Sequence, residues 1–419
     1  MNVRTNTAQV VVDRARHSAW AGCALLLALA GTASAGPAEQ AKRIYERLAG
    51  EPPSPAVMIQ LANAVCGAST CAPGSPSLSP GDPKLIAAAV IATTPATAPT
   101  FYNVTLKNWV IPWTNRDQTV FAPLNDYAAT VIGMVRDDVP FNTALSADLV
   151  YTVNAAGLPA PSNASNAHYA TAEANGVDLS SALKTNLQSS VYGTPSAATA
   201  GLITTYGAQS AFFINGTNRA MFRFTMINHF CNDMQTLMDT TRPTDRIRQD
   251  VARSPGGDSR VFLNNCVGCH SGMDPMAQAF AYYNFNGTAG AVTNTGTMEY
   301  TAGQVQPKYF INSTNFVYGF VTPDDSWSNR WRQGVNSALF GWDTNLPGSG
   351  SGAKSLGTEL ESSSLFAQCQ VQKVFQAVCF RTPTAADQAT VTQLTDSFKT
   401  GGYKLKQAFQ QTAAACPGQ

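Results

Sequence analysis

The chain has 419 residues and a mass of 44.3 kDa, a length that suits two or three domains rather than one small module. Hydrophobic residues make up 44% and charged residues 13%, which excludes a disordered chain kept open by charge repulsion. With 27 Lys and Arg against 26 Asp and Glu, the chain is close to neutral, which argues against nucleic acid as its main partner.

The first 35 residues predict a cleaved export signal. A basic stretch that ends at Arg16 precedes an apolar run around Leu26, and Ala33-Ser34-Ala35 supplies the small-residue cleavage pattern. The alternative is an uncleaved membrane anchor, but the apolar run is shorter than the roughly 20 residues that span a bilayer. Cleavage removes three Arg and one Asp from the totals of 27 and 26, which leaves 24 basic and 25 acidic residues. We expect a bacterial periplasmic or otherwise exported protein with no membrane span after signal removal.

Helical patterns dominate the first part of the mature chain. Ile44 and Leu48 lie four residues apart in a predicted helix over 38–49, and a second helix follows near 55–65. A Pro-, Ser- and Gly-rich linker comes next at 72–83. Further helices are predicted at 122–136, 141–152, 198–213 and 217–238.

One short run carries a strong chemical signal. Cys266-Val267-Gly268-Cys269-His270 is a C-x-x-C-H sequence, the pattern at which c-type haem is attached. Two thiols three positions apart can add to the two vinyl groups on one edge of a porphyrin, and the adjacent His then gives an imidazole nitrogen to the iron. The motif predicts one covalently attached haem c, bound by Cys266, Cys269 and His270.

Other uses of this motif are a Cys266–Cys269 disulfide or half of a zinc site. A zinc site needs further Cys or His ligands, and the mature chain has only His168, His229 and His270. Export favours haem, because haem is attached to such motifs outside the cytoplasm. Downstream, Asp274-Pro275 predicts a helix start, with Asp274 as the cap and Pro275 at the first helical position.

The sixth iron ligand has several candidates. Met298 lies in the Gly/Thr-rich segment 294–298, which is predicted to be a loop that can fold over the open haem face. His229 lies upstream, on a predicted helix. An open or water-ligated iron is the third possibility. Methionines more often fill cores than bind metals, and a lone His is more often a hydrogen-bonded structural residue.

The remainder of the chain contains two segments that differ in composition and predicted structure. Residues 287–365 are rich in Gly, Thr, Ser and Asn and predict loops with a few short strands. Residues 366–419 predict three short helices in an antiparallel bundle. Apolar residues at helical spacing mark one face of each helix: Val371, Val374, Phe375 and Val378; then Val391, Leu394 and Phe398; then Leu405 and Phe409.

The segment from Cys269 to Pro275 (C-H-S-G-M-D-P), followed by Ala279-Phe280 and Tyr283-Asn284-Phe285, resembles the haem segment of planctomycete-type cytochrome c proteins. These are large exported proteins built from several domains of unknown function. Their Met-Asp-Pro is typically followed by Ala-Leu-Glu-x-Phe-Asp, whereas this chain has Ala-Phe-Ala-Tyr-Tyr-Asn-Phe. Weaker likenesses extend over residues 115–415. The resemblance implies haem binding and electron transfer, with no settled substrate.

The cysteine count predicts three disulfides. Of nine cysteines, Cys23 leaves with the signal and two are assigned to haem, so an even number remains in an oxidising compartment. The remaining cysteines are Cys66, Cys71, Cys231, Cys369, Cys379 and Cys416.

The positions of these cysteines suggest their pairing. Cys66 and Cys71 bracket a short loop and form the natural local pair. Cys379 and Cys416 each share a helix face with apolar residues, so their bond can join the C-terminal helices. Cys231 is then left with Cys369. The family resemblance is consistent with this pairing, because its members often carry a Cys near both of those positions.

Together these features predict a mainly α, multi-domain protein. Its predicted parts are a signal peptide (1–35), an N-terminal helical region with linker (36–115), a helical domain (116–240), a loop-rich cytochrome c-like haem domain (241–365) and a C-terminal helical bundle (366–419). The predicted function is that of an exported monohaem c-type cytochrome-like protein that transfers single electrons to or from a redox partner protein. The alternatives are a haem enzyme of peroxidase or oxygenase type with an open sixth iron position, and a binding or scaffold module that contains haem.

Overall fold

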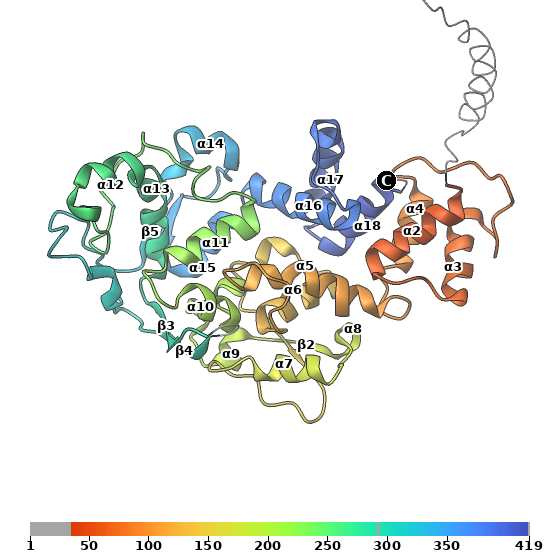
Figure 1. Cartoon of the computed structure of the whole chain (residues 1–419), viewed down its shortest axis with the longest axis horizontal. Coiled ribbons are helices and arrows are strands. Elements are labelled where there is room, and N and C mark those ends of the chain that lie inside the picture. Colours follow the sequence, from red (N-terminus) through yellow and green to blue (C-terminus); the bar gives the residue numbers. More distant parts are fainter. Residues whose placement is uncertain (1–34, 291–293, 418–419) are drawn as a thin grey trace, which may run out of the picture.

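A computed structural model describes residues 35–290 and 294–417, in which the protein is mainly helical, as predicted (Figure 1). The α-helices are α2 (Pro37–Ala49), α3 (Pro55–Cys66), α4 (Pro83–Ile91), α5 (Leu106–Val110), α6 (Asp126–Arg136), α7 (Ala167–Ala174), α8 (Leu179–Ala182), α9 (Gln188–Tyr192), α10 (Tyr206–Phe212), α11 (Arg219–Phe230), α12 (Ser259–Asn265), α13 (Val267–Ala277), α14 (Val335–Phe340), α15 (Gly352–Glu361), α16 (Ser364–Cys379), α17 (Gln388–Thr400) and α18 (Leu405–Ala415). The strands form three antiparallel pairs: β1 (Val150–Val153) with β2 (Leu183–Asn186), β3 (Tyr283–Thr288) with β4 (Thr295–Tyr300), and β5 (Ser326–Ser328) with β6 (Ser349–Ser351).

Local sequence signals fix the N-terminal helices. The Ser54 hydroxyl accepts a hydrogen bond from the backbone N–H of Val57 at 3.3 Å, and Pro55 occupies the first helical turn of α3. Gly67 ends the same helix in the left-handed region, at φ 72°. The predicted helices over 38–49 and 55–65 are therefore confirmed as α2 and α3. The helix α4, which follows the predicted linker, was not predicted.

The main hydrophobic core of the described residues extends from Ala41 to Cys416 and includes side chains from all four predicted parts of the mature chain. The predicted C-terminal helices are present as α16, α17 and α18, which pack on one another. The last of them, α18, also packs on α2 and α4, so the two ends of the described chain meet (Figure 1). There the Arg47 guanidinium donates to the Cys416 carbonyl, and the Gln410 amide donates to the Thr93 hydroxyl at 2.8 Å.

The predicted helix over 141–152 is wrong. Only a short turn at Phe141–Thr143 is helical, and the buried residues Val150–Val153 form β1 instead. The reason is tertiary packing, because β1 crosses α6 closely at Gly133. A Cβ at Gly133 would lie 2.2 Å from the ring of Tyr151, so only glycine permits this approach. Long-range contact of this kind overrides helical periodicity.

Other predicted boundaries also shift. The predicted helices over 198–213 and 217–238 are shorter, as α10 and α11. The second of these ends at Cys231, which takes the left-handed conformation with φ 55°. Within the segment predicted as loops and short strands, Gly352–Glu361 forms the helix α15.

Three disulfides join the pairs that the sequence predicted. Cα–Cα distances are 5.4 Å for Cys66–Cys71, 5.4 Å for Cys231–Cys369 and 5.9 Å for Cys379–Cys416. Such bonds fit a protein that folds in an oxidising compartment. The predicted signal peptide lies outside the described residues, apart from Ala35. Within the described ranges, no helix is both long and apolar enough to cross a membrane.

Glu361, at the end of α15, is a buried carboxyl that holds the loop before β1. Its side chain accepts a hydrogen bond from the backbone N–H of Leu145 at 2.8 Å and another from the Ser146 hydroxyl. Nearby, a Cβ at Gly357 would lie 1.9 Å from the Leu145 carbonyl oxygen, so α15 and this loop are in close contact. Burial raises the pKa of Glu361 from 4.5 to about 8, although both hydrogen bonds oppose the shift.

We expect Glu361→Gln to remove a pH dependence of stability. Because the pKa is higher in the folded chain, this group's stabilising effect is complete below pH 4.5 and is lost as the pH rises to about 8. Within this window its contribution falls by at most about 1.4 kcal/mol per pH unit. Urea unfolding at pH 5 and pH 9 measures the difference, with Glu39→Gln on the exposed face of α2 as the control. An identical pH profile for wild type and Glu361→Gln would contradict this role.

Candidate haem site

The C-x-x-C-H motif lies at the junction of α12 and α13. Asp258 caps α12 through the backbone N–H of Arg260, and Cys266 stands between the two helices. The backbone N–H groups of Cys269 and His270 lie 3.2 and 3.1 Å from the Cys266 carbonyl, which closes the first turn of α13. Residues three apart on a helix share a face. Local helix formation therefore brings the two thiols to the same side.

The two motif cysteines are the free cysteines of the described chain, and both are half-buried. The alternative Cys266–Cys269 disulfide is therefore not formed. The Cys269 thiol donates to the Met234 carbonyl at 3.3 Å, and burial raises the pKa of this thiol. For the zinc alternative, no group of three or more His, Cys, Asp or Glu side chains suited to a metal ion occurs among the described residues.

His270 is held by a carboxylate one helical turn further on. Its Nδ1 lies 3.2 and 3.1 Å from the two oxygens of Asp274, while the His270 side chain is 19% exposed and Asp274 is fully buried. A carboxylate only accepts hydrogen bonds, so Nδ1 carries the proton and Nε2 is bare in the neutral ring. Nε2 is the atom available to a metal. The ring centroid of Phe262 lies 5.6 Å from that of His270.

The helix start predicted at Asp274 is wrong. The helix α13 begins at Val267 and runs through Pro275, which lies near its C-terminal end. A proline there costs one backbone hydrogen bond. The Asp274 carboxylate does not cap a helix, because it binds His270 and Arg219 instead.

Behind Asp274 lies a chain of buried ion pairs. Arg219, at the start of α11, donates to both oxygens of Asp274 at 2.6 and 2.9 Å and to both oxygens of Asp250 at 2.9 and 2.6 Å. The fully buried Arg248 donates to Asp250 at 2.8 Å. Burial alone would raise the pKa of Asp274, but the positive charge of Arg219 and the hydrogen bonds from Arg219 and His270 lower it far below its usual range. Asp274 is therefore an ionised acceptor.

Apolar side chains flank the motif on both sides. Cys266 and Val267 pack against a small cluster formed by Ile247, Val251, Phe262 and Phe316. On the other side, a Cβ at Gly268 would lie 3.3 Å from Met238, and the Asn336 amide donates to the Leu237 carbonyl at 2.9 Å, which places α14 there.

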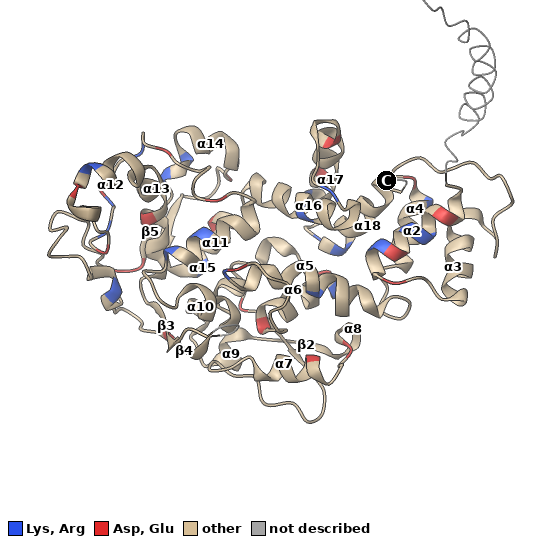
Figure 2. Cartoon of the chain, in the orientation of Figure 1, with Lys and Arg blue, Asp and Glu red and all other residues tan. Residues whose placement is uncertain are grey.

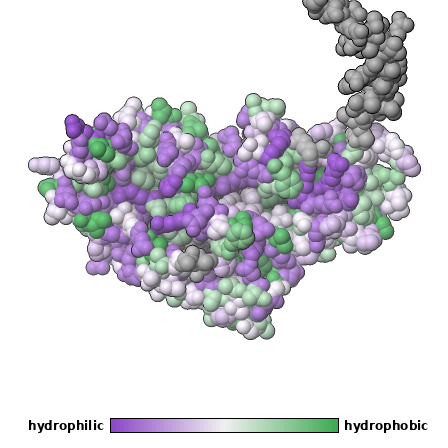
Figure 3. All heavy atoms as spheres, viewed as in Figure 1, coloured by the Kyte–Doolittle hydropathy of each residue, from purple (hydrophilic) through white to green (hydrophobic). Residues whose placement is uncertain are grey.

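Large apolar side chains remain exposed around this motif. Met238 is 51% exposed, Leu263 46% and Val335 67%. Figure 3 shows apolar surface interspersed with hydrophilic surface at this end of the molecule, and Figure 2 shows charges of both signs near α12 and α13. Two free thiols and an imidazole with a bare nitrogen form a donor set that fits a covalently attached haem. The apolar side chains around them are consistent with this use.

Met298 lies in another part of the fold. The segment predicted as a loop over the haem is the strand β4, in which Met298 pairs with Phe285 of β3. The Met298 sulfur accepts a hydrogen bond from the Gln209 amide at 3.1 Å, and its backbone N–H donates to the Asn163 carbonyl. In Figure 1, β4 lies beside α10 and apart from α13.

His229 lies in the aromatic core. It is 2% exposed, and its Nε2 lies 2.8 Å from the Tyr127 hydroxyl oxygen. The rings of Trp113, Phe141 and Phe366 surround it at centroid distances of 5.6, 6.3 and 6.0 Å. Burial lowers the pKa of His229 from 6.5 to about 3, with a further contribution from Lys373. In these surroundings His229 is a neutral structural residue.

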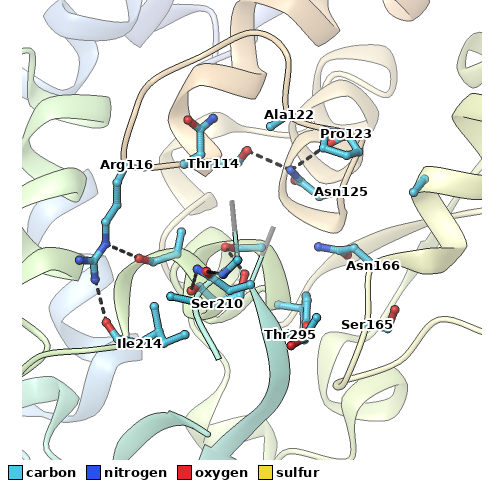
Figure 4. A pocket seen from close by; sticks show the side chains of 18 of the residues that line it. Thr114, Arg116, Ala122, Pro123, Asn125, Ser165, Asn166, Ser210, Ile214 and Thr295 are labelled. Atoms are coloured by element: carbon cyan, nitrogen blue, oxygen red, sulfur yellow. Dashed lines mark hydrogen bonds between the residues drawn. The ribbon is translucent and has the colours of Figure 1, made fainter. Parts of the chain in front are cut away.

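A separate cavity of about 520 Å³, with both polar and apolar lining, lies between the 114–125 loop, the start of α7, α10 and β4 (Figure 4). Amides and hydroxyls line it, among them Asn125, Asn166, Ser210 and Thr295. Its lining contains none of Cys266, Cys269 and His270, so it is not part of the haem motif's surroundings. Sequence reasoning did not find this cavity, because its residues come from distant segments and form no motif.

Sequence reasoning also missed the ion-pair chain. The spacing of His270 and Asp274 is a detectable signal, since residues four apart meet on a helix. The pairing of Arg219 with Asp250 and Asp274 has no comparable local signal.

No family model matches the chain, and neither a curated protein nor a solved structure matches it.

We expect His229 to make the protein sensitive to acid. The folded state does not take up a proton on this ring until about pH 3, whereas the unfolded chain does so near 6.5. Stability should therefore fall as the pH drops through this window, by at most about 1.4 kcal/mol per pH unit from this group. His229→Gln should flatten the profile in urea unfolding between pH 4 and pH 7. Tyr127→Phe keeps the buried ring and should keep the slope, and a flat wild-type profile would refute the expectation.

Proposed function

We propose that this chain is an exported monohaem c-type cytochrome-like protein that transfers single electrons to or from a partner protein. One observation carries the proposal. Two free thiols stand one helical turn apart beside a histidine whose Nδ1 is held by Asp274, in a chain whose other described cysteines are all disulfide-bonded. The resemblance to planctomycete-type cytochrome c proteins points to the same function.

The two cysteines and the histidine of the motif each have a definite role in this proposal. Cys266 and Cys269 bind the porphyrin through thioether bonds, and Nε2 of His270 binds the iron. When bound, haem supplies an iron that changes between the ferrous and ferric states. Asp274 keeps the His270 ring in one orientation and one tautomer. The buried ring of Phe262 excludes water on its side of His270.

Export is part of the same proposal. The predicted signal peptide, the motif and the three disulfides all suit an oxidising compartment outside the cytoplasm. A carrier with one haem needs far fewer residues than this chain has. The remaining helices therefore provide surface for a partner or shape a second site.

A haem enzyme with an open sixth position is the second candidate. The observation that favours it is that both predicted sixth ligands are engaged elsewhere. The Met298 sulfur accepts from Gln209, and Nε2 of His229 is bonded to Tyr127. While these contacts persist, neither side chain is free to bind an iron held by His270.

Covalent haem attachment is the first test. Full-length protein produced in a bacterial host with a c-type maturation system should show a Soret band and a porphyrin adduct on the peptide that contains Cys266 and Cys269. Replacing both cysteines with Ala should abolish the adduct. The double variant Cys66→Ser, Cys71→Ser removes a disulfide elsewhere and should keep it. Wild-type protein with neither a Soret band nor the adduct would overturn the proposal.

Axial ligation separates the two candidates. A low-spin iron that does not take up added CO or cyanide, as seen by absorption and magnetic circular dichroism, is the result expected of the electron carrier. Ready binding of CO to a high-spin iron would instead favour the enzyme, and a haem that cannot be reversibly reduced would favour a scaffold. The variants Met298→Leu and His229→Gln show whether either residue supplies the sixth ligand, because loss of that ligand converts the iron to a high-spin form.

A further inference from the structure

Asp274 joins the predicted iron ligand to the ion pairs behind it. Its carboxylate has no exposed surface, and both oxygens face Nδ1 of His270 as well as the guanidinium of Arg219. The distances are 3.2 and 3.1 Å to His270 and 2.6 and 2.9 Å to Arg219. All the polar contacts of this carboxylate thus go either to the ring or to Arg219.

The ion pairs furthest from His270 are fixed by further contacts of Arg248 and Asp250. Arg248 lies over the ring of Tyr309, 4.2 Å from its centroid, and donates to the Thr217 carbonyl at 2.9 Å. Asn312 donates to the backbone carbonyl of Asp250 at 2.8 Å. Turning Asp274 away from His270 would break buried charge pairs, which is strongly unfavourable. The carboxylate is therefore preorganised toward the ring.

We propose that Asp274, held by Arg219 and Asp250, is a positioning residue that fixes the His270 ring and strengthens its donation to iron, and so lowers the reduction potential of the bound haem. This inference rests on the proposed haem attachment. A metal-bound histidine that donates its other N–H to a carboxylate becomes a more basic ligand. A more basic axial ligand stabilises the ferric state, and hydrogen bonding beyond the ligand is an established means of setting haem potentials.

Arg219 weakens the action of Asp274 on the His270 ring. Its guanidinium draws on the same two oxygens that accept from His270, which reduces the pull of the carboxylate on the Nδ1 proton. It also shares its charge with Asp250, which leaves part of the negative charge of Asp274 uncompensated. Asp250 contacts Arg219 and not the His270 ring, so its influence on the ring is indirect and smaller than that of Asp274.

Asp274→Asn is the decisive variant. Asn has the same shape but no charge, so the ferrous state should become at least tenfold more favoured, which is 59 mV for a one-electron couple. Spectroelectrochemical titration of the holoprotein measures this shift. An unchanged or lower potential in Asp274→Asn would overturn the inference.

Asp250→Asn is the matched control. It also removes one buried negative charge from the same ion-pair chain, but it leaves the contact between Asp274 and His270 in place. In this variant the equilibrium between the ferrous and ferric states should change less than threefold. An equal shift in both variants would mean that net charge, and not contact with the ring, determines the potential, and this outcome would also overturn the inference.

A measurement without haem separates the two proposals. The chain has four histidines, so nitrogen NMR of the full-length apoprotein can be assigned by comparison with His270→Asn. We expect His270 to be protonated at Nδ1 in the wild-type chain and mainly at Nε2 in Asp274→Asn. A bare Nδ1 in the wild type would overturn the positioning role even if haem binds. The expected tautomer in a chain that never binds haem would refute the proposed function alone, and this readout still decides the positioning role if Asp274→Asn does not fold.

Discussion

Arg219 between two buried carboxylates is the interaction on which the part of the protein around the C-x-x-C-H motif depends. Its guanidinium binds Asp250 and Asp274 at the same time, each through two hydrogen bonds. Leaving one of these buried charges unpaired would destabilise the folded state by several kcal/mol. The helices α11 and α13 and the segment around Asp250 therefore stabilise one another. The fork of an arginine suits this task, because it can meet two planar carboxylates at once.

Disulfides provide a second, covalent constraint around this electrostatic one. Cys231 ends α11 in a left-handed conformation and is bonded to Cys369 in α16. The Cys379–Cys416 bond then ties α16 to α18, which packs on the N-terminal helices. The helix that supplies Arg219 is thus connected, through one continuous core, to both ends of the described chain.

Local signals in the sequence predicted the parts of the fold that depend on neighbouring residues. Ile44 and Leu48 at helical spacing predicted α2, and an even number of cysteines predicted three disulfides that the structure contains. The failures have a common cause. Tyr151 forms a strand because it packs on Gly133, and Asp274 does not cap a helix because Arg219, 55 residues away, binds it. Spacing along one chain carries no information on such distant partners.

The same limit applies to the candidate site. The two thiols and His270 follow from a five-residue pattern, and the contact with Asp274 follows from helical spacing. Arg219, Asp250 and Arg248 are ordinary charged residues until folding brings them together. The polar surroundings of the proposed iron ligand are therefore much harder to predict from sequence than the candidate ligand itself.

The bond between Cys231 and Cys369 closes a covalent ring, with a sequence separation of 138 residues, that contains the whole C-x-x-C-H motif. In the chain-entropy view, closing a ring of this size disfavours the unfolded state by about 5 kcal/mol. The ring also affects how the protein responds to proteolysis. A protease that nicks the backbone once between these cysteines leaves both fragments joined through sulfur, so a single cleavage cannot release the segment that carries the motif.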